Sequence, residues 1–260
     1  MITKEEQGEE VDIRMIYREK KIYSGNMLEI EIYPITLQER KQSRRKKEKE
    51  SVPKQRNLNE KNAKKHLARL INTNFTDKDL TVTLSYDNEH RPKSEEEASK
   101  DVRNFIRRIK RYLKKYKKPD LKYIAVVEYA ENIKIHHHIV LSGDIDREKL
   151  EELWGKGWAN SHRLKANEFG YEELAKYIAK DPKGRKRWSQ SKNLKKPVVR
   201  VNDFKYSRRK IREIKTTQGE KAYFEKMFKG YTYRDFKYIE NEINACTYIT
   251  IKMQKINGRN

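Results

Sequence analysis

The hydrophobic pattern is clearest in the middle of the chain, where it changes from a strand-like to a helix-like period. Residues 80–86 (LTVTLSY) are rich in β-branched and apolar side chains, which is typical of a strand. Apolar positions then recur at helical spacing from Ala98 to Ile109, behind a capping box formed by Ser94 and Glu97. The pattern predicts a strand followed by a long amphipathic helix.

The same reasoning gives the next elements. Their expected ranges are strands at 121–129, 135–142 and 158–164, and helices at 146–154 and 171–180. The order from about residue 80 to 182 is β-α-β-β-α-β-α, and without its last helix this is the ferredoxin-like arrangement. We therefore expect an α+β fold, with a central antiparallel sheet and helices packed on it. That fold places its first and third strands in the centre, so strand 135–142 should be central.

The flanks are less regular. Strand-like pieces at 13–17 and 27–33 precede a charge run at 38–56, and a helix is expected from Asn59 to about Asn72. The end of the chain predicts a helix at 221–228 and strands at 231–238 and 246–253, whose packing the sequence leaves open. We expect three parts: N-terminal strands and a basic linker at 1–56, the main domain at 57–200, and a basic, aromatic-rich extension at 201–260.

Charge narrows the range of partners. The formal net charge is +23, from 62 Lys and Arg against 39 Asp and Glu, and 16 tyrosines accompany these residues. Such a chain attracts polyanions, with nucleic acid as the first expectation and an anionic membrane surface as the second. No apolar run reaches about 18 residues, so we expect no membrane-spanning helix. One cysteine, Cys246, excludes an intrachain disulfide, and with no signal-peptide pattern we expect a cytoplasmic protein.

Three consecutive histidines suggest a metal site. Side chains alternate along a strand, so His136 and His138 should share one face and His137 the other. A hairpin turn near 131–134 would bring Glu128 beside the pair. Two imidazoles and one carboxylate suit a divalent metal, Mn²⁺ or Mg²⁺, with coordination positions left open. The plain alternative is that these histidines pair with core or surface groups.

Tyr177 and Lys180 lie three residues apart on the last expected helix and so share a face. A phenol is a weak nucleophile because its pKa is near 10, but a neighbouring cation favours the phenolate. Attack by Tyr177 on a phosphodiester would give a 5′-phosphotyrosine and a free 3′-hydroxyl. On its own a Y-x-x-K pattern is weak, since it usually marks a half-buried ring beside a solvated charge.

Taken together, these segments resemble the HUH endonucleases, specifically the rolling-circle replication initiators of small phages and plasmids. The similar stretch runs from about residue 57 to 197, roughly half of the chain. It includes LTVTLSYD, VVEYAENIKIHHHIVLSG, LWGKGWANSHRL, LAKYIAKDP and SKNLKKP. The resemblance implies a ferredoxin-like endonuclease domain that nicks and rejoins single-stranded DNA at an origin, which is expected to be a hairpin.

The resemblance also implies roles for individual residues. His136, His138 and Glu128 would hold the metal, Tyr177 would be the nucleophile and Lys180 its helper. Some relatives carry a second tyrosine four residues earlier, where this chain has Glu173, so a two-tyrosine mechanism is not expected; Glu173 could activate water or be a plain surface residue. A second departure is His137, since the middle position is usually bulky and apolar, and a shift of strand register would make it a ligand.

Other residues are expected to contact DNA. They are Tyr86 and Asp87 after the first strand, and Arg185, Lys186, Arg187, Trp188, Lys192, Lys195 and Lys196 in the basic stretch. Trp188 is the best candidate for stacking on bases, whereas Trp154 and Trp158 are expected in the core. Charge runs are often only solvated, so this set is the least specific.

Three functions remain open. The leading one is a phage or plasmid replication initiator acting in a bacterial host cell. The others are a conjugative relaxase or single-strand transposase of the same fold, and a non-catalytic module that binds single-stranded nucleic acid. No G-x-x-x-x-G-K-[ST] loop is present, so an initiator of this kind would have to recruit a host helicase and polymerase.

Overall fold

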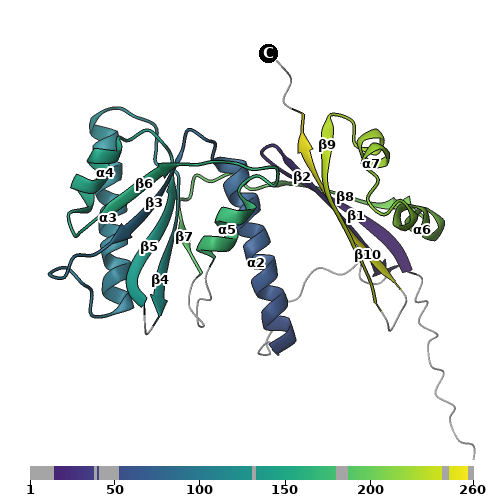
Figure 1. Cartoon of the computed structure of the whole chain (residues 1–260), viewed down its shortest axis with the longest axis horizontal. Helices are drawn as coiled ribbons and strands as arrows, with labels where there is room; N and C mark the ends of the chain where they lie inside the picture. Colours follow the sequence, from purple (N-terminus) through teal and green to yellow (C-terminus); the bar gives the residue numbers. More distant parts are fainter. Residues whose placement is uncertain are drawn as a thin grey trace, which may run out of the picture. The chain divides into compact units, whose positions relative to one another are not determined.

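The computed structural model describes residues 15–37, 40, 53–130, 133–179, 187–241 and 246–256. The chain divides into two compact units. One comprises Met1–Ile22, Leu28–Lys49 and Val199–Asn260, and the other comprises Tyr23–Met27 and Glu50–Val198. Each unit is built on a five-stranded sheet (Figure 1). The protein is therefore α+β, as predicted.

The sheet of the second unit has the predicted ferredoxin-like order. Its strands are β3 (Leu80–Ser85), β4 (Tyr123–Ala130), β5 (Ile133–Leu141), β6 (Ala159–Arg163) and β7 (Ser189–Gln190). They lie in the order β6-β3-β5-β4-β7, and every neighbouring pair is antiparallel. The prediction that the histidine-bearing strand is central is confirmed, because β5 lies between β3 and β4. The short β7 was not predicted and extends the β4 edge.

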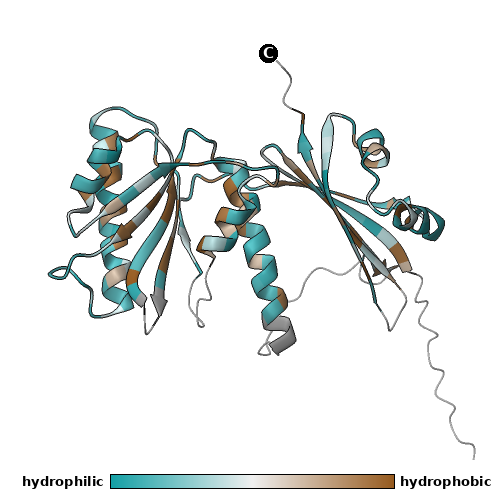
Figure 2. Cartoon of the chain, viewed as in Figure 1, coloured by the Kyte–Doolittle hydropathy of each residue, from teal (hydrophilic) through white to brown (hydrophobic). Residues whose placement is uncertain are grey.

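Two helices cover one face of this sheet, α3 (Glu95–Lys115) and α4 (Arg147–Trp154) (Figure 1). The predicted cap of α3 is confirmed, since the Ser94 side chain accepts a hydrogen bond from the Glu97 backbone N–H. The core beneath these helices includes Phe105 and Trp154, both fully buried. α3 is mostly hydrophilic, with its hydrophobic residues on only part of each turn (Figure 2), as an amphipathic helix on a sheet requires.

The other face carries α2 (Pro53–Asn74) and α5 (Glu172–Ile178). α2 begins six residues before the expected Asn59, and its first residue is proline, which the first turn of a helix accepts because its N–H needs no partner there. The two helices pack on the sheet through a second apolar cluster. Its members include Leu67, Ile71, Val140, Ala175 and Ile178. This cluster covers only part of the face.

The first unit joins strands from both ends of the chain. Its strands are β1 (Met15–Ser24), β2 (Met27–Thr36), β8 (Val198–Tyr206), β9 (Tyr231–Glu240) and β10 (Thr247–Lys255), in the order β8-β1-β2-β10-β9. Its helices are α6 (Arg208–Thr216) and α7 (Lys221–Met227). The sequence did not predict β8 or α6. The guanidinium of Arg18 on β1 donates two hydrogen bonds, of 2.6 and 2.8 Å, to the carboxylate of Asp203 on β8.

Within the described ranges, no helix has both the length and the hydropathy that a membrane span requires.

Candidate metal centre and nucleophile

The strand pairing of the second unit brings the predicted metal ligands together. In the antiparallel pair of β4 and β5, Glu128 is directly opposite His136. His138 follows two residues later and so shares the face of His136. One oxygen of Glu128, Oε2, lies 3.1 Å from Nε2 of each histidine. The ligand atoms of the three residues all lie within 4.8 Å of one another.

The other nitrogen of each imidazole faces a polar group. His136 Nδ1 lies 2.9 Å from the backbone oxygen of Lys134, and His138 Nδ1 lies 3.5 Å from the Thr83 hydroxyl on β3. A carbonyl oxygen only accepts, so Nδ1 of His136 carries the hydrogen, and a neutral ring then presents a lone pair at Nε2. This second contact fixes the ring orientation, as it does for metal-binding histidines generally.

The donor set fits a divalent cation. A lone pair on Nε2 and a carboxylate oxygen 3.1 Å away repel each other unless positive charge lies between them. The Glu128 side chain is only 12% exposed and that of His138 only 2%, so water screens this repulsion poorly. Two imidazoles and one carboxylate are fewer ligands than a closed site requires, which leaves positions for substrate oxygens. Glu128, His136 and His138 could therefore hold a divalent metal ion.

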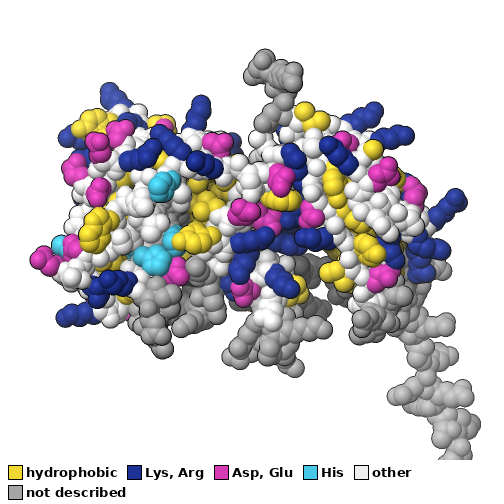
Figure 3. All heavy atoms as spheres, viewed as in Figure 1, with side chains coloured by type: hydrophobic (Ala, Val, Ile, Leu, Met, Phe, Trp, Pro, Cys, Tyr) yellow, Lys and Arg dark blue, Asp and Glu magenta, His cyan; other side chains and the backbone are white. Residues whose placement is uncertain are grey.

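Tyr177 lies beside this group. Its ring contacts the imidazole of His138 edge to face, with ring centroids 5.1 Å apart and planes at 69°. α5 is held by Ala175 and Ile178, which are buried in the apolar cluster, whereas Tyr177 is 58% exposed. In the space-filling view, histidine side chains gather on this face with acidic and hydrophobic side chains next to them (Figure 3). An accessible phenol thus borders the candidate metal centre.

The other proposed catalytic residues are only partly described. Glu173 is exposed in the first turn of α5, four residues before Tyr177 and therefore one helical turn away. Its neighbour Glu172 pairs with Lys176. Lys180 lies outside the described residues, as do Arg185 and Lys186 from the predicted DNA-contact set.

His137 takes the opposite face, which removes the reason for counting it as a ligand. It is fully buried, and its Nε2 lies 2.8 Å from the hydroxyl of Tyr86. Burial, and then the neighbouring His136 and His138, lower the pKa of His137 to about 3. A neutral ring at this position fills the place of the bulky apolar residue that is usual in the family it resembles.

The position of Tyr86 corrects one sequence expectation. It was expected to line the DNA groove, but it is 7% exposed and its hydroxyl is used inside the core with His137. Burial and the nearby Asp101 raise its pKa. Asp87 is at the surface, where its carboxylate accepts hydrogen bonds from the backbone and ring of His90. That pairing lowers the pKa of Asp87, and a contact with DNA remains a prediction.

The basic stretch is less uniform than its sequence indicates. Lys192, Lys195 and Lys196 are exposed, whereas Arg187 is half-buried. Trp188 is also half-buried; it packs on the apolar cluster beneath α2 and lies 6.1 Å from His66 between ring centroids. Stacking of Trp188 on bases remains a prediction, but much of its ring already contacts protein.

Two tryptophans were expected in the core, and one of them is not there. Trp154 is fully buried and donates from Nε1 to the backbone oxygen of Ser85, as expected. Trp158 is 60% exposed, so that expectation is wrong. Its backbone pairs with Ser85 in both directions, which turns its side chain to the face that bears the metal group. Alternation against the buried Ala159 was the available signal.

Tyr171 is structural, in agreement with the sequence analysis. It is buried at the N-terminus of α5, and its hydroxyl donates to a carboxylate oxygen of Asp77 over 2.7 Å. Burial and this hydrogen bond raise its pKa, which disfavours the nucleophilic phenolate. Tyr177 is thus the tyrosine of α5 that stands beside the candidate metal centre.

Comparison with known proteins gives one similarity. Residues 79–182 match the model of a family of replication-associated proteins of the ORF2 type. The matched segment runs from the start of β3 to just beyond α5 and contains Glu128, His136, His138 and Tyr177. It covers about two fifths of the chain. No curated protein and no solved structure matches.

Proposed function

We propose that this chain is a replication initiator that nicks single-stranded DNA at an origin and can rejoin it. Tyr177 is the nucleophile, and Glu128, His136 and His138 hold a divalent metal ion. The observation that carries the proposal is the contact between the Tyr177 ring and His138, one of the three members of the metal-binding group. The similarity of residues 79–182 to a replication-associated family supports the same conclusion.

The three metal-binding residues position the scissile phosphate. Glu128, His136 and His138 leave one side of the group open toward Tyr177, so a phosphate oxygen bound there lies near the phenol. A divalent cation held by these residues would polarise the phosphate and stabilise the charge that grows on its oxygens. The chain's own contribution is orientation, since the ligands stand on central strands and the nucleophile on a helix anchored by buried residues.

The chemistry is a transesterification. The Tyr177 phenolate oxygen attacks phosphorus, a new P–O bond to tyrosine forms, and the bond to the 3′-oxygen breaks. The proton of the phenol is released and the departing 3′-oxygen takes one up, so protons balance. One phosphoester replaces another, and the free 3′-hydroxyl can therefore reverse the reaction and rejoin the strand. Lys180 is proposed to favour the phenolate, since a nearby cation lowers the pKa of a phenol.

The proposal is tested with Tyr177→Phe. Wild-type protein, Mn²⁺ and a random pool of single-stranded oligonucleotides are incubated, and the protein is analysed by mass spectrometry for a tyrosine-linked adduct. We expect the adduct and strand cleavage in the wild type and neither in Tyr177→Phe, which still binds the pool. Tyr171→Phe is the matched control, because it removes a hydroxyl from the same helix terminus and should keep the adduct.

The alternatives predict different results. Cleavage with a normal adduct in Tyr177→Phe would reject Tyr177 as the nucleophile. Binding without any metal-dependent cleavage by the wild type would favour a non-catalytic nucleic-acid-binding module. A relaxase or single-strand transposase would form the same adduct, and the flanking DNA of its preferred site would distinguish it from an initiator. Since an initiator of this kind needs strand separation and synthesis, we also propose that it works with a host helicase and polymerase.

A further inference from the structure

An exposed tryptophan lies in the same row of the sheet as the candidate metal centre. Across the second unit, Trp158 is opposite Ser85, Ser85 is opposite His136, and His136 is opposite Glu128. Directly opposed residues of antiparallel strands point to the same face. Trp158 thus lies about two strand spacings from His136, or roughly 10 Å between backbones. A single DNA strand can span that distance.

The backbone holds Trp158 in place. The Trp158 N–H donates to the oxygen of Ser85 over 3.2 Å, and the Ser85 N–H donates to the oxygen of Trp158 over 3.0 Å. Gly157 precedes it with a φ of +135°, and a Cβ there would lie 2.5 Å from the Ser85 oxygen. Only glycine permits this close approach of the two chains. A large ring on a fixed backbone with 60% of its surface exposed is suited to binding a ligand rather than to packing.

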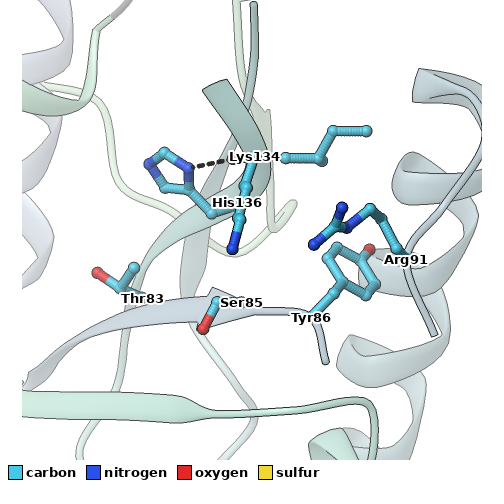
Figure 4. Close-up of a pocket in the computed structure, with 7 residues that line it drawn as sticks. Thr83, Ser85, Tyr86, Arg91, Lys134 and His136 are labelled. Carbon is cyan, nitrogen blue, oxygen red and sulfur yellow. Dashed lines mark hydrogen bonds between the residues drawn. The ribbon is translucent and has the colours of Figure 1, made fainter. Parts of the chain in front are cut away.

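Between Trp158 and the metal group, a pocket opens at the end of β3. It has a volume of about 170 Å³ and is lined by Thr83, Ser85, Tyr86, Arg91, Lys134, Ile135 and His136. Figure 4 shows Lys134 and Arg91 entering the pocket beside His136, with the hydroxyls of Thr83 and Ser85 below them. Two cations, two hydroxyls and an imidazole are groups that bind phosphate.

The charge of the pocket is unbalanced. None of the described residues that line it is acidic. Arg91 donates to the side-chain amide oxygen of Asn88, a neutral partner that leaves its charge uncompensated. Lys134 is exposed. A polyanion therefore fits this surface better than an apolar protein partner does, because apolar partners gain nothing from desolvating two cations.

We propose that this pocket and Trp158 together bind the nucleotide next to the scissile phosphate of single-stranded DNA. Arg91 and Lys134 hold its phosphate, and the indole of Trp158 stacks on its base. This inference rests on the proposed function, since it takes the phosphate bound at His136 and His138 as the scissile one. His136 belongs to both sites, so the two phosphates are neighbours along one strand.

The test measures binding without cleavage. Full-length Tyr177→Phe is titrated with fluorescein-labelled oligothymidylate and with an abasic deoxyribose-phosphate strand of equal length, and anisotropy gives the two affinities. A stacked base contributes roughly 5- to 100-fold in affinity. We expect Trp158→Ala to reduce the preference for thymidylate by a factor in that range, and Trp158→Phe to keep most of it.

The cations should behave differently from the ring. Arg91→Ala and Lys134→Ala are expected to weaken the binding of both strands alike, and each should reduce the slope of log affinity against log salt by about 0.7. Tyr116→Ala and Lys114→Ala are the matched controls. They remove an exposed aromatic ring and a cation at the end of α3, on the opposite face of the sheet, and should change neither quantity.

The outcomes separate this inference from the proposed function. If Trp158→Ala keeps the thymidylate preference of its parent, the stacking site is rejected, whether or not the wild type cleaves DNA. If Trp158→Ala instead changes self-association or protein binding while DNA binding stays intact, the surface serves a protein partner and the inference is also rejected. If the base preference depends on Trp158 but the wild type forms no adduct, this binding site stands and the nicking function fails.

Discussion

The ring of Tyr177 and the imidazole of His138 meet edge to face with 5.1 Å between their centroids, although they belong to different elements of the second unit. His138 stands on β5, a central strand, and Tyr177 stands on α5, a short helix on the same face of the sheet. Neither element alone places a phenol at a metal group. The contact depends on Ala175 and Ile178, whose burial anchors α5.

The first prediction concerns the metal. Glu128→Gln keeps the side-chain shape but removes the charge between the two imidazoles, so it should weaken Mn²⁺ binding at least about 10-fold, or about 1.4 kcal/mol. Metal-dependent thermal stabilisation measures this, because saturation with a ligand at 100 times its Kd adds about 2.7 kcal/mol to folding. His162→Ala, at an exposed histidine of β6, should respond to Mn²⁺ like the wild type. An unchanged metal response in Glu128→Gln would contradict the ligand assignment.

The second prediction concerns the buried pair under the metal face. Tyr86→Phe removes the hydroxyl that pairs with Nε2 of His137, which leaves a buried polar atom unsatisfied and should cost about 1–3 kcal/mol of unfolding free energy. Denaturant unfolding measures it. The double variant Tyr86→Phe with His137→Leu removes both polar partners and should recover part of that loss. If the double variant is less stable than the sum of the single changes, the pair is not the reason for the loss.

The third prediction concerns Glu173. It lies one helical turn before Tyr177 and is exposed, so a carboxylate there could activate the water that hydrolyses the phosphotyrosine. Glu173→Gln should form the adduct at the wild-type rate and release it more slowly, by roughly 100-fold or more. The decay of a purified adduct gives this rate directly, with Glu172→Gln as the control on the adjacent position. Equal decay in both variants would make Glu173 a plain surface residue.

The fourth prediction concerns the pH dependence of stability in the first unit. The hydrogen bond from Arg18 holds the pKa of Asp203 below its usual value. A carboxyl whose pKa is lowered by folding adds stability above its unfolded pKa of about 3.9, and this stability is lost as the pH falls through that range toward the folded value. Asp203→Asn should be less stable than the wild type at neutral pH, and the difference should shrink in acid.

Unfolding of the first unit as a function of pH measures this effect. Asp235→Asn is the control, since Asp235 pairs with Lys237, whose side chain is 73% exposed, and such surface pairs contribute little. A stability difference between the wild type and Asp203→Asn that stays constant down to pH values well below about 3.9 would reject the linkage.

Much of the second unit could be predicted because local pattern and local chemistry agree there. The Ser94 cap, the spacing from Ala98 to Ile109 and the alternation in β3 each follow from neighbouring residues, and all are confirmed. By contrast, β8 (VVRVNDFKY) was missed. Most of its side chains are exposed, so no buried face imposes an alternating pattern on the sequence. The Arg18–Asp203 pair joins positions 185 residues apart, which no local pattern reveals.

The sequence by itself determined which residues can do the chemistry. Strand alternation puts His136 and His138 on one face, a hairpin brings Glu128 opposite them, and helical spacing identifies Tyr177, since these relations depend only on backbone geometry over a few residues. Tertiary structure alone decided that α5 sets Tyr177 against His138, that Trp158 faces solvent rather than the core, and that Tyr86 turns inward to His137. Which face of an element is buried depends on its distant neighbours, and the local pattern around Tyr86 and Trp158 does not specify them.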